Sequence, residues 1–395
     1  MDKIGLAVIG SGYWGGNWVR TFNERPDSRV VVVCDQSQDR LDEIGKRFPQ
    51  VELTTRIEEA VGREDVQAAV VCTPAATHYD VAFRCLAAGK HVLIEKPMTT
   101  VSADAERLIT LAAAKGLTLM VGHTFLYNSG IRTVKHYIES GEAGQLYYLY
   151  ARRTNMGPIR RDVSAMWDLA PHDVAIFNYL LDATPEWVSA VGARVLATSK
   201  EDVGFVSLGY PGSIVGHIHV SWAEPNKVRE LVVVGREKRL FFDDLNLTEP
   251  VRVFDKGVSP AAPGLNGRSD LEFAMHDGSI LSPKIEAVEP LKAESSHFLS
   301  CIANRTCSIS CGAEGIDVVR VMEAIDLSLA RNGAPVEVGM RVLPNAFENR
   351  LHNVTPDVIR TLAVRSMEHQ MEHNGIAHNG TDHDGTAAIV EKEDR

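Results

Sequence analysis

The stretch Lys3-Ile4-Gly5-Leu6-Ala7-Val8-Ile9-Gly10-Ser11-Gly12-Tyr13-Trp14-Gly15 decides the fold of the first part of the chain. An apolar run over residues 6–9 predicts a strand that stops at Gly10, and residues 17–23 predict a helix after it. In such a junction Gly10 permits the tight turn, Gly12 lets a pyrophosphate approach the backbone, and Gly15 lets helix and strand pack closely. The helix N-terminus offers free N–H groups to the phosphates. Dinucleotide contacts are therefore predicted for Gly10, Ser11, Gly12, Tyr13, Trp14 and Gly15.

Asp35 indicates which dinucleotide the site prefers. It lies twenty residues after Gly15, at the end of a second predicted strand over residues 30–34. A carboxylate at this position binds the ribose hydroxyls of NAD and repels the additional phosphate of NADP. Arg40 lies too far along the chain to be an obvious clamp for that phosphate. We therefore predict NAD as the cofactor, with NADP as the less favoured alternative.

Strands and helices alternate through the first 122 residues. Further strands are predicted over residues 68–72, 91–94 and 117–121, and further helices over residues 41–48, 79–88 and 103–115. Continuous apolar, β-branched strands between helices indicate a parallel sheet that is covered on both faces. With right-handed crossovers this is the doubly wound Rossmann fold. Residues 1–122 are therefore predicted to form an NAD-binding domain.

Two segments follow predicted strands of that sheet and are expected to border the cofactor, because ligands of such folds lie beyond the carboxyl ends of the strands. The first is Thr73-Pro74-Ala75-Ala76-Thr77-His78 and the second is Glu95-Lys96-Pro97. A lysine at a strand end beside a proline is held in position. The sequence alone leaves the geometry of the Lys96–Pro97 bond open. Cofactor contacts are predicted for Thr73, Pro74, His78, Glu95 and Lys96.

After residue 122 the pattern changes to that of a second, α+β domain over residues 123–345. Helices are predicted over residues 131–139, 166–181, 295–304 and 316–331, and strands over residues 146–153, 203–210, 213–222, 229–234 and 239–243. Successive strands joined by turns indicate an open, mostly antiparallel sheet. Residues 250–285 are rich in Pro and Gly and are predicted to be a long excursion. The polar tail over residues 346–395 is predicted to be disordered rather than to bind metal through His369, His373, His378 and His383.

Asp168 and His172 are candidates for catalysis on the predicted helix over residues 166–181. They are four residues apart, so they share one face and can meet. A carboxylate beside an imidazole holds its tautomer and raises its basicity, which suits a general base near neutral pH. A purely structural pair has the same spacing, so the sequence leaves both roles open.

Arg152, Arg153, Arg160 and Arg161 surround the segment Asn155-Met156-Gly157-Pro158. These arginines are either part of a solvated loop or an anion site, because guanidinium groups suit phosphate and carboxylate. His217 and His219 alternate with apolar residues and are expected on one face of the sheet. A solvated or subunit-facing surface is favoured there over a binding site.

The composition is that of a globular protein with small-molecule partners. The 395 residues are 45% hydrophobic and 24% charged, and 52 acidic against 41 basic residues give a net charge of −11. This balance argues against nucleic acid or an anionic membrane as the main partner. A strand begins at residue 3, and no apolar run reaches the roughly 18 residues of a membrane span, so we expect a cytoplasmic protein without a targeting segment. The six cysteines form no CxxC motif, which favours reduced thiols over a metal site.

Three motifs together resemble the glucose–fructose oxidoreductase / inositol dehydrogenase / rhizopine-catabolism (Gfo/Idh/MocA) family over roughly residues 3–340. They are the glycine motif, Glu95-Lys96-Pro97, and Asp168-Leu169-Ala170-Pro171-His172-Asp173. The resemblance implies bound NAD(P), oxidation or reduction of a sugar or cyclitol hydroxyl, and a homo-oligomer, either a dimer or a tetramer, often formed through the open sheet. It matches Lys96 to the motif lysine, Asp168 to the first acid and His172 to the catalytic histidine. It also implies cofactor contacts at His123 and Trp167.

The resemblance extends to members that act on nucleotide sugars, through residues 122–128, 152–155 and 167–173. It implies substrate contacts at Tyr127, Asn128, Arg153 and Asn155, together with the catalytic residues Lys96, Asp168 and His172. We therefore predict NAD-dependent oxidation at C3 of a UDP-N-acetylhexosamine or related nucleotide sugar, as in amino-sugar and polysaccharide biosynthesis. In this mechanism His172 takes the hydroxyl proton, Asp168 orients the imidazole, and Lys96 donates to the substrate oxygen. The alternatives are an inositol or free-sugar dehydrogenase, an NAD-dependent glycosidase, and a non-catalytic NAD-binding regulator.

Overall fold

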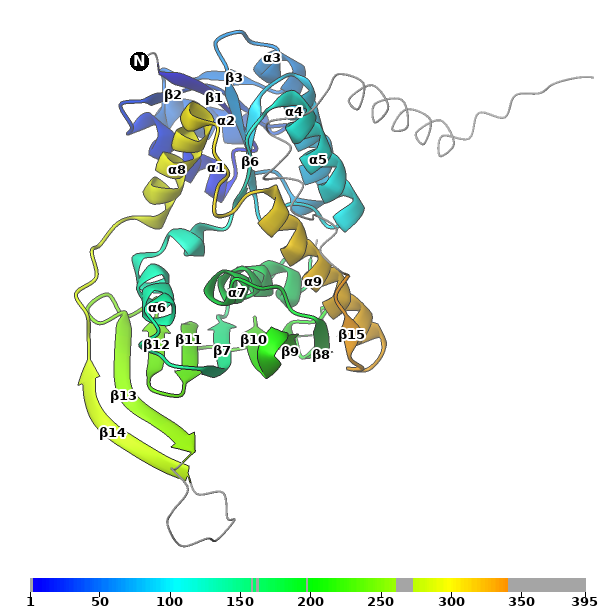
Figure 1. The fold of residues 1–395 in the computed structure, drawn as a ribbon. Coiled ribbons are helices and arrows are strands. Elements are labelled where there is room, and N and C mark those ends of the chain that lie inside the picture. The colour runs from blue at the N-terminus through cyan, green and yellow to red at the C-terminus, as the bar shows by residue number, and fades with distance from the viewer. Residues whose placement is uncertain (1–2, 158, 161–162, 197, 261–272, 340–395) are drawn as a thin grey trace, which may run out of the picture. The chain divides into compact units, whose positions relative to one another are not determined.

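The computed structural model describes residues 3–157, 159–160, 163–196, 198–260 and 273–339, which contain two sheets with helices packed against them (Figure 1). The first sheet has six parallel strands in the order β3-β2-β1-β4-β5-β6. The strands are β1 (Ile4–Ile9), β2 (Ser28–Cys34), β3 (Glu52–Thr54), β4 (Ala68–Val71), β5 (His91–Glu95) and β6 (Leu119–Gly122). The order reverses direction between β1 and β4, which is the switch point at which doubly wound folds bind their ligands. The predicted Rossmann architecture is confirmed.

The helices of this part connect successive strands of the sheet. They are α1 (Tyr13–Asn23), α2 (Gln38–Arg47), α3 (Ile57–Val61), α4 (His78–Ala87) and α5 (Ser102–Lys115). The first helix buries Trp18, Val19 and Phe22 completely, and this apolar stripe fixes it on the sheet. It begins four residues before the predicted helix, at Tyr13, so Gly15 lies inside its first turn. The elements β3 and α3 were not predicted because they are only three and five residues long, which is too short to show a periodic pattern.

The second sheet has nine strands in the order β14-β13-β12-β11-β7-β10-β9-β8-β15. They are β7 (Leu146–Thr154), β8 (Trp187–Ala193), β9 (Val203–Tyr210), β10 (Ile214–Ser221), β11 (Val228–Gly235), β12 (Arg239–Asp243), β13 (Val251–Pro260), β14 (Phe273–Leu281) and β15 (Val336–Glu337). All neighbours pair antiparallel except β10 and β7. This confirms the predicted α+β class. The helices after residue 122 are α6 (Ser129–Glu139), α7 (Ala165–Leu181), α8 (Pro290–Asn304) and α9 (Gly312–Ala330).

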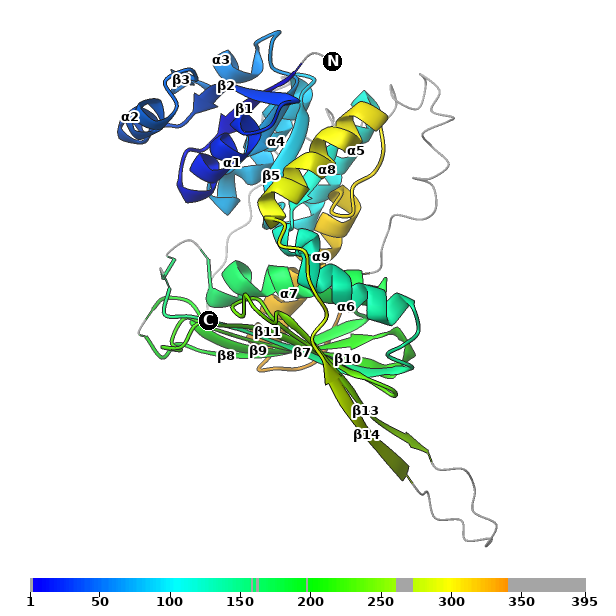
Figure 2. The same ribbon diagram turned by 90° about the vertical axis from the view of Figure 1, so that its left-hand side faces the viewer.

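The segment over residues 250–285 differs from its prediction. Its described part forms β13 and β14, a two-stranded arm that extends the sheet beyond β12 (Figures 1 and 2). Val251 and Val253 are buried against the core, while most of the arm's outer residues are exposed. The sequence signal of a strand is weak here because much of the arm buries no apolar face, so the Pro and Gly content dominated the prediction. The sequence predicted a long excursion here but not the two strands that form its described part.

The late helices return to the first sheet. α9 contacts α5 and β6, and α8 contacts α1. Just before α9, the Ser310 carbonyl accepts a hydrogen bond of 2.7 Å from the Val121 N–H, so the chain after residue 300 is joined to the end of β6. The boundary predicted at residue 122 therefore stays a prediction, because the layer around the first sheet is not formed by residues 1–122 alone.

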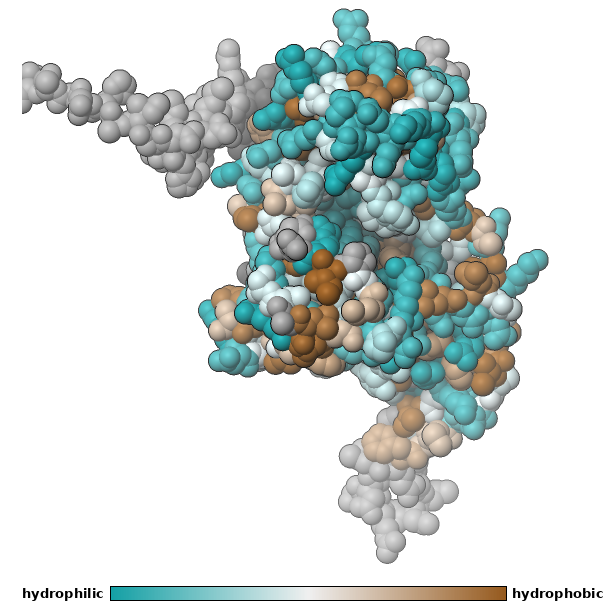
Figure 3. Space-filling view, turned by 180° about the vertical axis from the view of Figure 1, so that it is seen from behind, coloured by the Kyte–Doolittle hydropathy of each residue, from teal (hydrophilic) through white to brown (hydrophobic). Residues whose placement is uncertain are grey.

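Exposed apolar side chains are concentrated on the second sheet. Figure 3 shows more apolar surface over the lower half of the molecule, where this sheet lies, than over the upper half. The exposed residues of its central strands are Tyr148, Tyr150, Val191, Phe205 and Val215. A surface of this kind is typical of contact with another protein, and the homo-oligomer implied by the resemblance stays a prediction.

The expectations about membrane spans and metal sites can be compared with the structure only for the described residues. Among these residues no helix is long and apolar enough to cross a membrane, and no three His, Cys, Asp or Glu side chains are grouped to hold a metal ion. The predicted tail over residues 346–395, with its four histidines, lies outside the described residues.

Candidate active site

The junction between β1 and α1 has the geometry of a dinucleotide cradle. Gly10 has φ of +92°, and a Cβ on Gly15 would lie 1.9 Å from the Gly10 carbonyl oxygen, so both positions require glycine. A Cβ on Gly12 would meet no protein atom within 4 Å. Gly12 also begins α1 without a capping side chain, which leaves the first N–H groups of the helix to a ligand. These features fit the pyrophosphate of a bound dinucleotide.

Asp35 lies at the end of β2 and closes one side of this cradle. Its Oδ2 accepts hydrogen bonds from the Ser11 N–H (2.7 Å) and hydroxyl (2.9 Å), and its Oδ1 accepts one from the Ser37 N–H (2.9 Å). Burial raises the pKa of Asp35, but the hydrogen bonds outweigh burial and lower it overall, so the group is ionised at neutral pH. The first turn of α2 places Arg40 Nη1 at 3.8 Å from Asp35 Oδ2. The expectation from chain distance that Arg40 lies away from this site was therefore wrong.

His78 connects the two predicted cofactor segments, because its ring contacts a backbone carbonyl of each. Its Nδ1 lies 2.7 Å from the Pro97 carbonyl oxygen and its Nε2 lies 2.8 Å from the Thr73 carbonyl oxygen. Burial lowers the pKa of His78, whereas the two carbonyl groups favour its protonated form. The Lys96–Pro97 bond is cis. Because both ring nitrogens already have backbone partners, His78 positions the loop after β4 and the segment after β5, and neither nitrogen is left to bind a cofactor.

Lys96 lies in contact with Asp168, the residue that the sequence predicted to orient His172. The Lys96 ammonium donates a hydrogen bond of 2.7 Å to the Asp168 carbonyl oxygen and lies 3.5 Å from the Asp168 carboxylate. Pro171 lacks the N–H that would bind the carbonyl of residue 167, which lies one residue before the carbonyl that Lys96 contacts. Burial lowers the pKa of Lys96, and the Asp168 carboxylate opposes that effect. The carboxylate also contacts Trp222 Nε1 and Arg160 Nη1, each at 3.4 Å.

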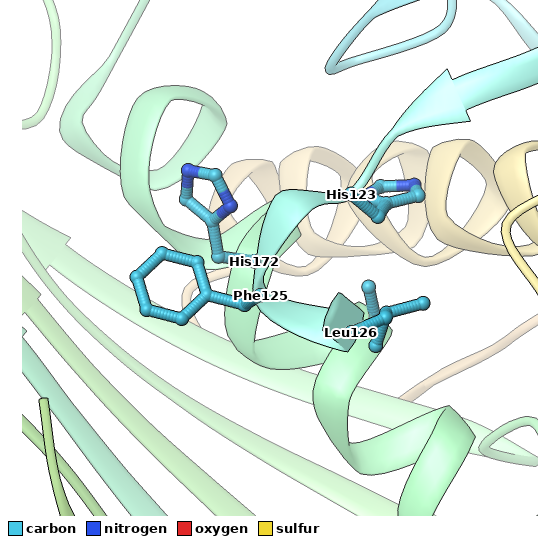
Figure 4. Close-up of a pocket in the computed structure, with 5 residues that line it drawn as sticks. His123, Phe125, Leu126 and His172 are labelled. Atoms are coloured by element: carbon cyan, nitrogen blue, oxygen red, sulfur yellow. The ribbon is translucent and has the colours of Figure 1, made fainter. Parts of the chain in front are cut away.

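His172 does not pair with Asp168, contrary to the prediction from their spacing. The Asp168 carboxylate turns towards Lys96, Arg160 and Trp222, and His172 Nδ1 is buried without a hydrogen-bond partner among the described residues. The imidazole instead packs edge-on against Phe125, with ring centroids 5.1 Å apart (Figure 4). Burial, followed by the positive charges of Lys96 and Arg153, holds the pKa of His172 well below its usual value. The ring is therefore neutral at physiological pH and can accept a proton.

His123 lies at the end of β6 and lines the same narrow pocket, with Phe125, Leu126, His172 and Ala175 (Figure 4). Its ring is buried, and neither nitrogen has a partner among the described residues. Burial, followed by the charge of Lys96, lowers its pKa to about 3. Unpaired buried polar atoms are costly, so a ligand that offers a hydrogen-bond donor would stabilise this site. This observation fits the predicted cofactor contact of His123.

The predicted arginine cluster is dispersed. Arg153 is buried and binds Asp173 through two hydrogen bonds of 3.0 and 2.8 Å. Arg152 lies on the opposite face of β7, where it pairs with Glu230. Arg160 contacts Asp168, and Arg161 lies outside the described residues. The described arginines of this segment therefore do not form one anion site, and the charge of Arg153 is neutralised within the protein.

Several other predicted site residues stabilise local structure. The Tyr127 ring is buried and its hydroxyl contacts His297, Ser308 and Ser310 at 3.0 to 3.1 Å, away from His172. The remaining side-chain contacts are Asn128 with Gly130 and Asp244, Trp167 Nε1 with Asp326, and Glu95 with Trp18 Nε1. Asn155 folds over Gly157. The structure thus groups Lys96, His123, Asp168 and His172, and adds Phe125 and Trp222, which the sequence gave no reason to select.

Comparison with known proteins identifies the class. Residues 4–123 match the oxidoreductase family with an NAD-binding Rossmann fold, and residues 131–241 match the C-terminal domain of the same Gfo/Idh/MocA family. The chain belongs to the Gfo/Idh/MocA family of NAD-binding oxidoreductases, as its motifs implied.

Individual relatives have different substrates in their names. UDP-N-acetylglucosamine 3-dehydrogenase of Acidithiobacillus ferrooxidans is 27% identical over 77% of this chain and 90% of its own length. Inositol 2-dehydrogenase of Gluconacetobacter diazotrophicus is 30% identical, but over 50% of this chain and 59% of its own length. Several curated relatives are likewise matched over little more than half of their length. The structure of GenD2 from gentamicin A biosynthesis, in complex with NAD, has a TM-score of 0.73 at 24% identity, covering 86% of this chain and 97% of that one.

The cradle can be tested with a pair of glycine variants. Gly15→Ala should lower both thermal stability and NAD affinity, because its Cβ would overlap the Gly10 carbonyl; overpacking of this kind costs about 1–3 kcal/mol. Gly12→Ala should leave the stability of the NAD-free protein unchanged and weaken NAD binding, because its Cβ points into open space. Thermal unfolding and calorimetric titration with NAD would measure both. Equal effects of the two variants on unfolding would contradict the assignment.

The two neutral histidines predict a pH dependence of stability. The pKa of His123 is about 3 in the folded protein, below the ~6.5 of an unfolded chain. The unfolded state therefore binds the extra proton, and His123 should lower the free energy of unfolding by about 1.4 kcal/mol per pH unit as the pH falls from ~6.5 towards 3. Urea unfolding at a series of pH values should give a shallower dependence for His123→Asn, and no change for His136→Gln on the exposed face of α6. A dependence that His123→Asn leaves intact would contradict the buried neutral state.

Proposed function

We propose that this chain oxidises the C3 hydroxyl of a UDP-N-acetylhexosamine, or a related nucleotide sugar, to the ketone with NAD. The observation that carries the proposal is a neutral, partly buried imidazole, His172, in one site with the paired Lys96 and Asp168. The choice of nucleotide sugar is supported by the relative named for UDP-N-acetylglucosamine, whose match extends through most of both chains. An inositol or free-sugar dehydrogenase is the second candidate, supported by inositol dehydrogenases that match over a shorter region.

The residues divide the chemistry between a base and a cationic donor. NAD, when bound, supplies the acceptor for the hydride that leaves the carbon bearing the hydroxyl. His172 accepts the hydroxyl proton, because its pKa is low enough to keep the ring neutral beforehand. Lys96 donates a hydrogen bond to the same oxygen and stabilises its developing negative charge. Burial lowers the pKa of Lys96 and so makes it a stronger donor than an exposed lysine.

Asp168 has a different role from the one the sequence suggested. Its carboxylate lies beside the Lys96 ammonium and raises the pKa of that group. It therefore keeps a buried lysine protonated, which the donor role of Lys96 requires. Orientation of His172 falls instead to packing against Phe125 and to the position of the ring on α7.

The reaction class is tested by the absorbance of reduced nicotinamide with a panel of substrates. The panel contains UDP-N-acetylglucosamine, its uronic acid, other nucleotide sugars, myo-inositol and glucose, with an aminotransferase to remove the ketone. We expect turnover of a nucleotide sugar, and a loss of about 10²-fold or more in His172→Ala with NAD affinity retained, because a placed base contributes ~10²–10⁴-fold. His136→Ala, on α6, is the matched control. Turnover of inositol or free sugar alone would select the second candidate, and near-normal turnover by His172→Ala would exclude this base.

No turnover would lead to two further measurements. Product analysis after incubation with glycosides tests a glycosidase that recycles NAD within one cycle. Binding of NAD and a partner protein without any product would indicate a regulator.

The role of Asp168 predicts a specific change in the pH profile. Asp168→Asn removes the carboxylate that raises the pKa of Lys96. Lys96 should then lose its proton at a lower pH, so the alkaline limb of the kcat–pH profile should shift to lower pH. The acid limb, which His172 sets, should stay in place because the two side chains do not pair. Glu230→Gln, a carboxylate paired with Arg152 on the other face of the sheet, should move neither limb. A shift confined to the acid limb would contradict this role and would support the Asp168–His172 interaction predicted from the sequence.

A further inference from the structure

Arg229 is a cationic side chain beside His172 that the proposed chemistry does not use. It lies on β11, directly opposite Arg153 on β7 in the register of the sheet, so both arginines emerge on the face that carries α7. The two differ in exposure. The side chains of Arg153 and its partner Asp173 are 5% and 4% exposed, whereas the side chain of Arg229 is 35% exposed. Arg229 is therefore accessible to a ligand in a way that Arg153 is not.

The guanidinium of Arg229 is held in place from one side. Its Nη1 lies 3.2 Å from Asp244 Oδ2, and the other oxygen of Asp244 accepts a hydrogen bond of 3.1 Å from Asn128 Nδ2. The Asp244 N–H binds the carbonyl oxygen of Arg229 itself at 3.0 Å. A guanidinium has five N–H donors, and Asp244 uses one edge of the group. The side chain is thus oriented by Asn128 and Asp244, with donors remaining for a ligand.

Arg229 is also connected to the proposed base through the ring of Phe125. Its Cζ lies 5.9 Å from the centroid of the Phe125 ring, and that ring lies 5.1 Å from the ring of His172. The positive charge of Arg229 is one of those that lower the pKa of His172. One aromatic ring, that of Phe125, therefore lies between Arg229 and the proposed base, on the side formed by the second sheet.

We propose that Arg229, oriented by Asp244, forms the subsite for an anionic group of the substrate, the diphosphate of the nucleotide sugar. This inference rests on the proposed function, which requires cationic donors for that group. A guanidinium suits phosphate because its donors match two oxygens at once. Arg153 is buried against Asp173, and Arg152 lies on the opposite face of β7 beside Glu230, so neither offers accessible donors on the face that carries α7. Recognition of the diphosphate therefore depends on a residue of β11 that lies far from that segment in the sequence.

Binding measurements with matched variants test the subsite. The ligands are UDP for a diphosphate, glucuronate for a carboxylate and myo-inositol for a neutral polyol, titrated calorimetrically into the enzyme with saturating NAD. Arg229→Gln should weaken UDP and UDP-N-acetylglucosamine by about 10- to 100-fold, because a hydrogen bond to a charged group contributes that much. Arg229→Lys, which keeps the charge and a donor for Asp244, should lose less. Arg152→Gln is the control, an arginine of the same sheet with one carboxylate partner, on the opposite face.

Each outcome decides the question. Weaker binding of the diphosphate ligands in Arg229→Gln, with the polyol unaffected and Arg152→Gln normal, supports the subsite. Weaker binding of glucuronate alone would assign Arg229 to a carboxylate and overturn the diphosphate. Equal losses in the two Gln variants, or none in Arg229→Gln while the wild type still oxidises a nucleotide sugar, would overturn the subsite but not the proposed function. A wild type that oxidises inositol and binds none of the anions would overturn both.

Discussion

The contact between Lys96 and helix α7 is the interaction on which the candidate site depends. Lys96 follows the last residue of β5, and its ammonium reaches the Asp168 carbonyl oxygen at 2.7 Å. A buried ammonium is unfavourable without polar partners, so this contact both stabilises the lysine and holds α7 against the first sheet. His78 supports the arrangement from behind by binding the carbonyl groups of Thr73 and Pro97. The segments after β4 and β5 and helix α7 are thus connected to one another by these contacts.

The electrostatics of the site follow from burial. His123 and His172 are kept neutral because a charged imidazole would lose its hydration there, and the nearby cations add to the effect. Lys96 is affected in the same direction, yet a carboxylate lies beside it and opposes the change. One carboxylate lies next to the lysine and none is bound to the histidine, which separates a protonated lysine from a neutral imidazole. Such a separation of neighbouring groups is typical of acid–base sites.

Prediction from the sequence succeeded where a local pattern has one structural solution. The glycine motif predicted the turn between β1 and α1 correctly, because a Cβ at Gly15 would overlap the carbonyl group of Gly10. The alternation of strands and helices up to residue 122 could be read because buried parallel strands are continuously apolar. It failed where a side chain has a choice of partners. Asp168 and His172 have the spacing of a contact on a helix, but the carboxylate turns to Lys96, which lies 72 residues away in the chain.

The sequence by itself determined the class of this protein: a Rossmann fold for NAD and a mostly antiparallel second sheet. These follow from backbone sterics and apolar periodicity, whereas Lys96, Asp168 and His172 were selected as candidates through the family resemblance of their motifs. The tertiary structure alone decided which charged groups are enclosed and which remain partly accessible: Arg153 is buried with Asp173, whereas Arg229, paired with Asp244, keeps part of its side chain exposed. It also revealed the arm of β13 and β14, whose outer residues bury no core. The physical reason is that ion pairing and burial depend on residues distant in sequence, which no local pattern records.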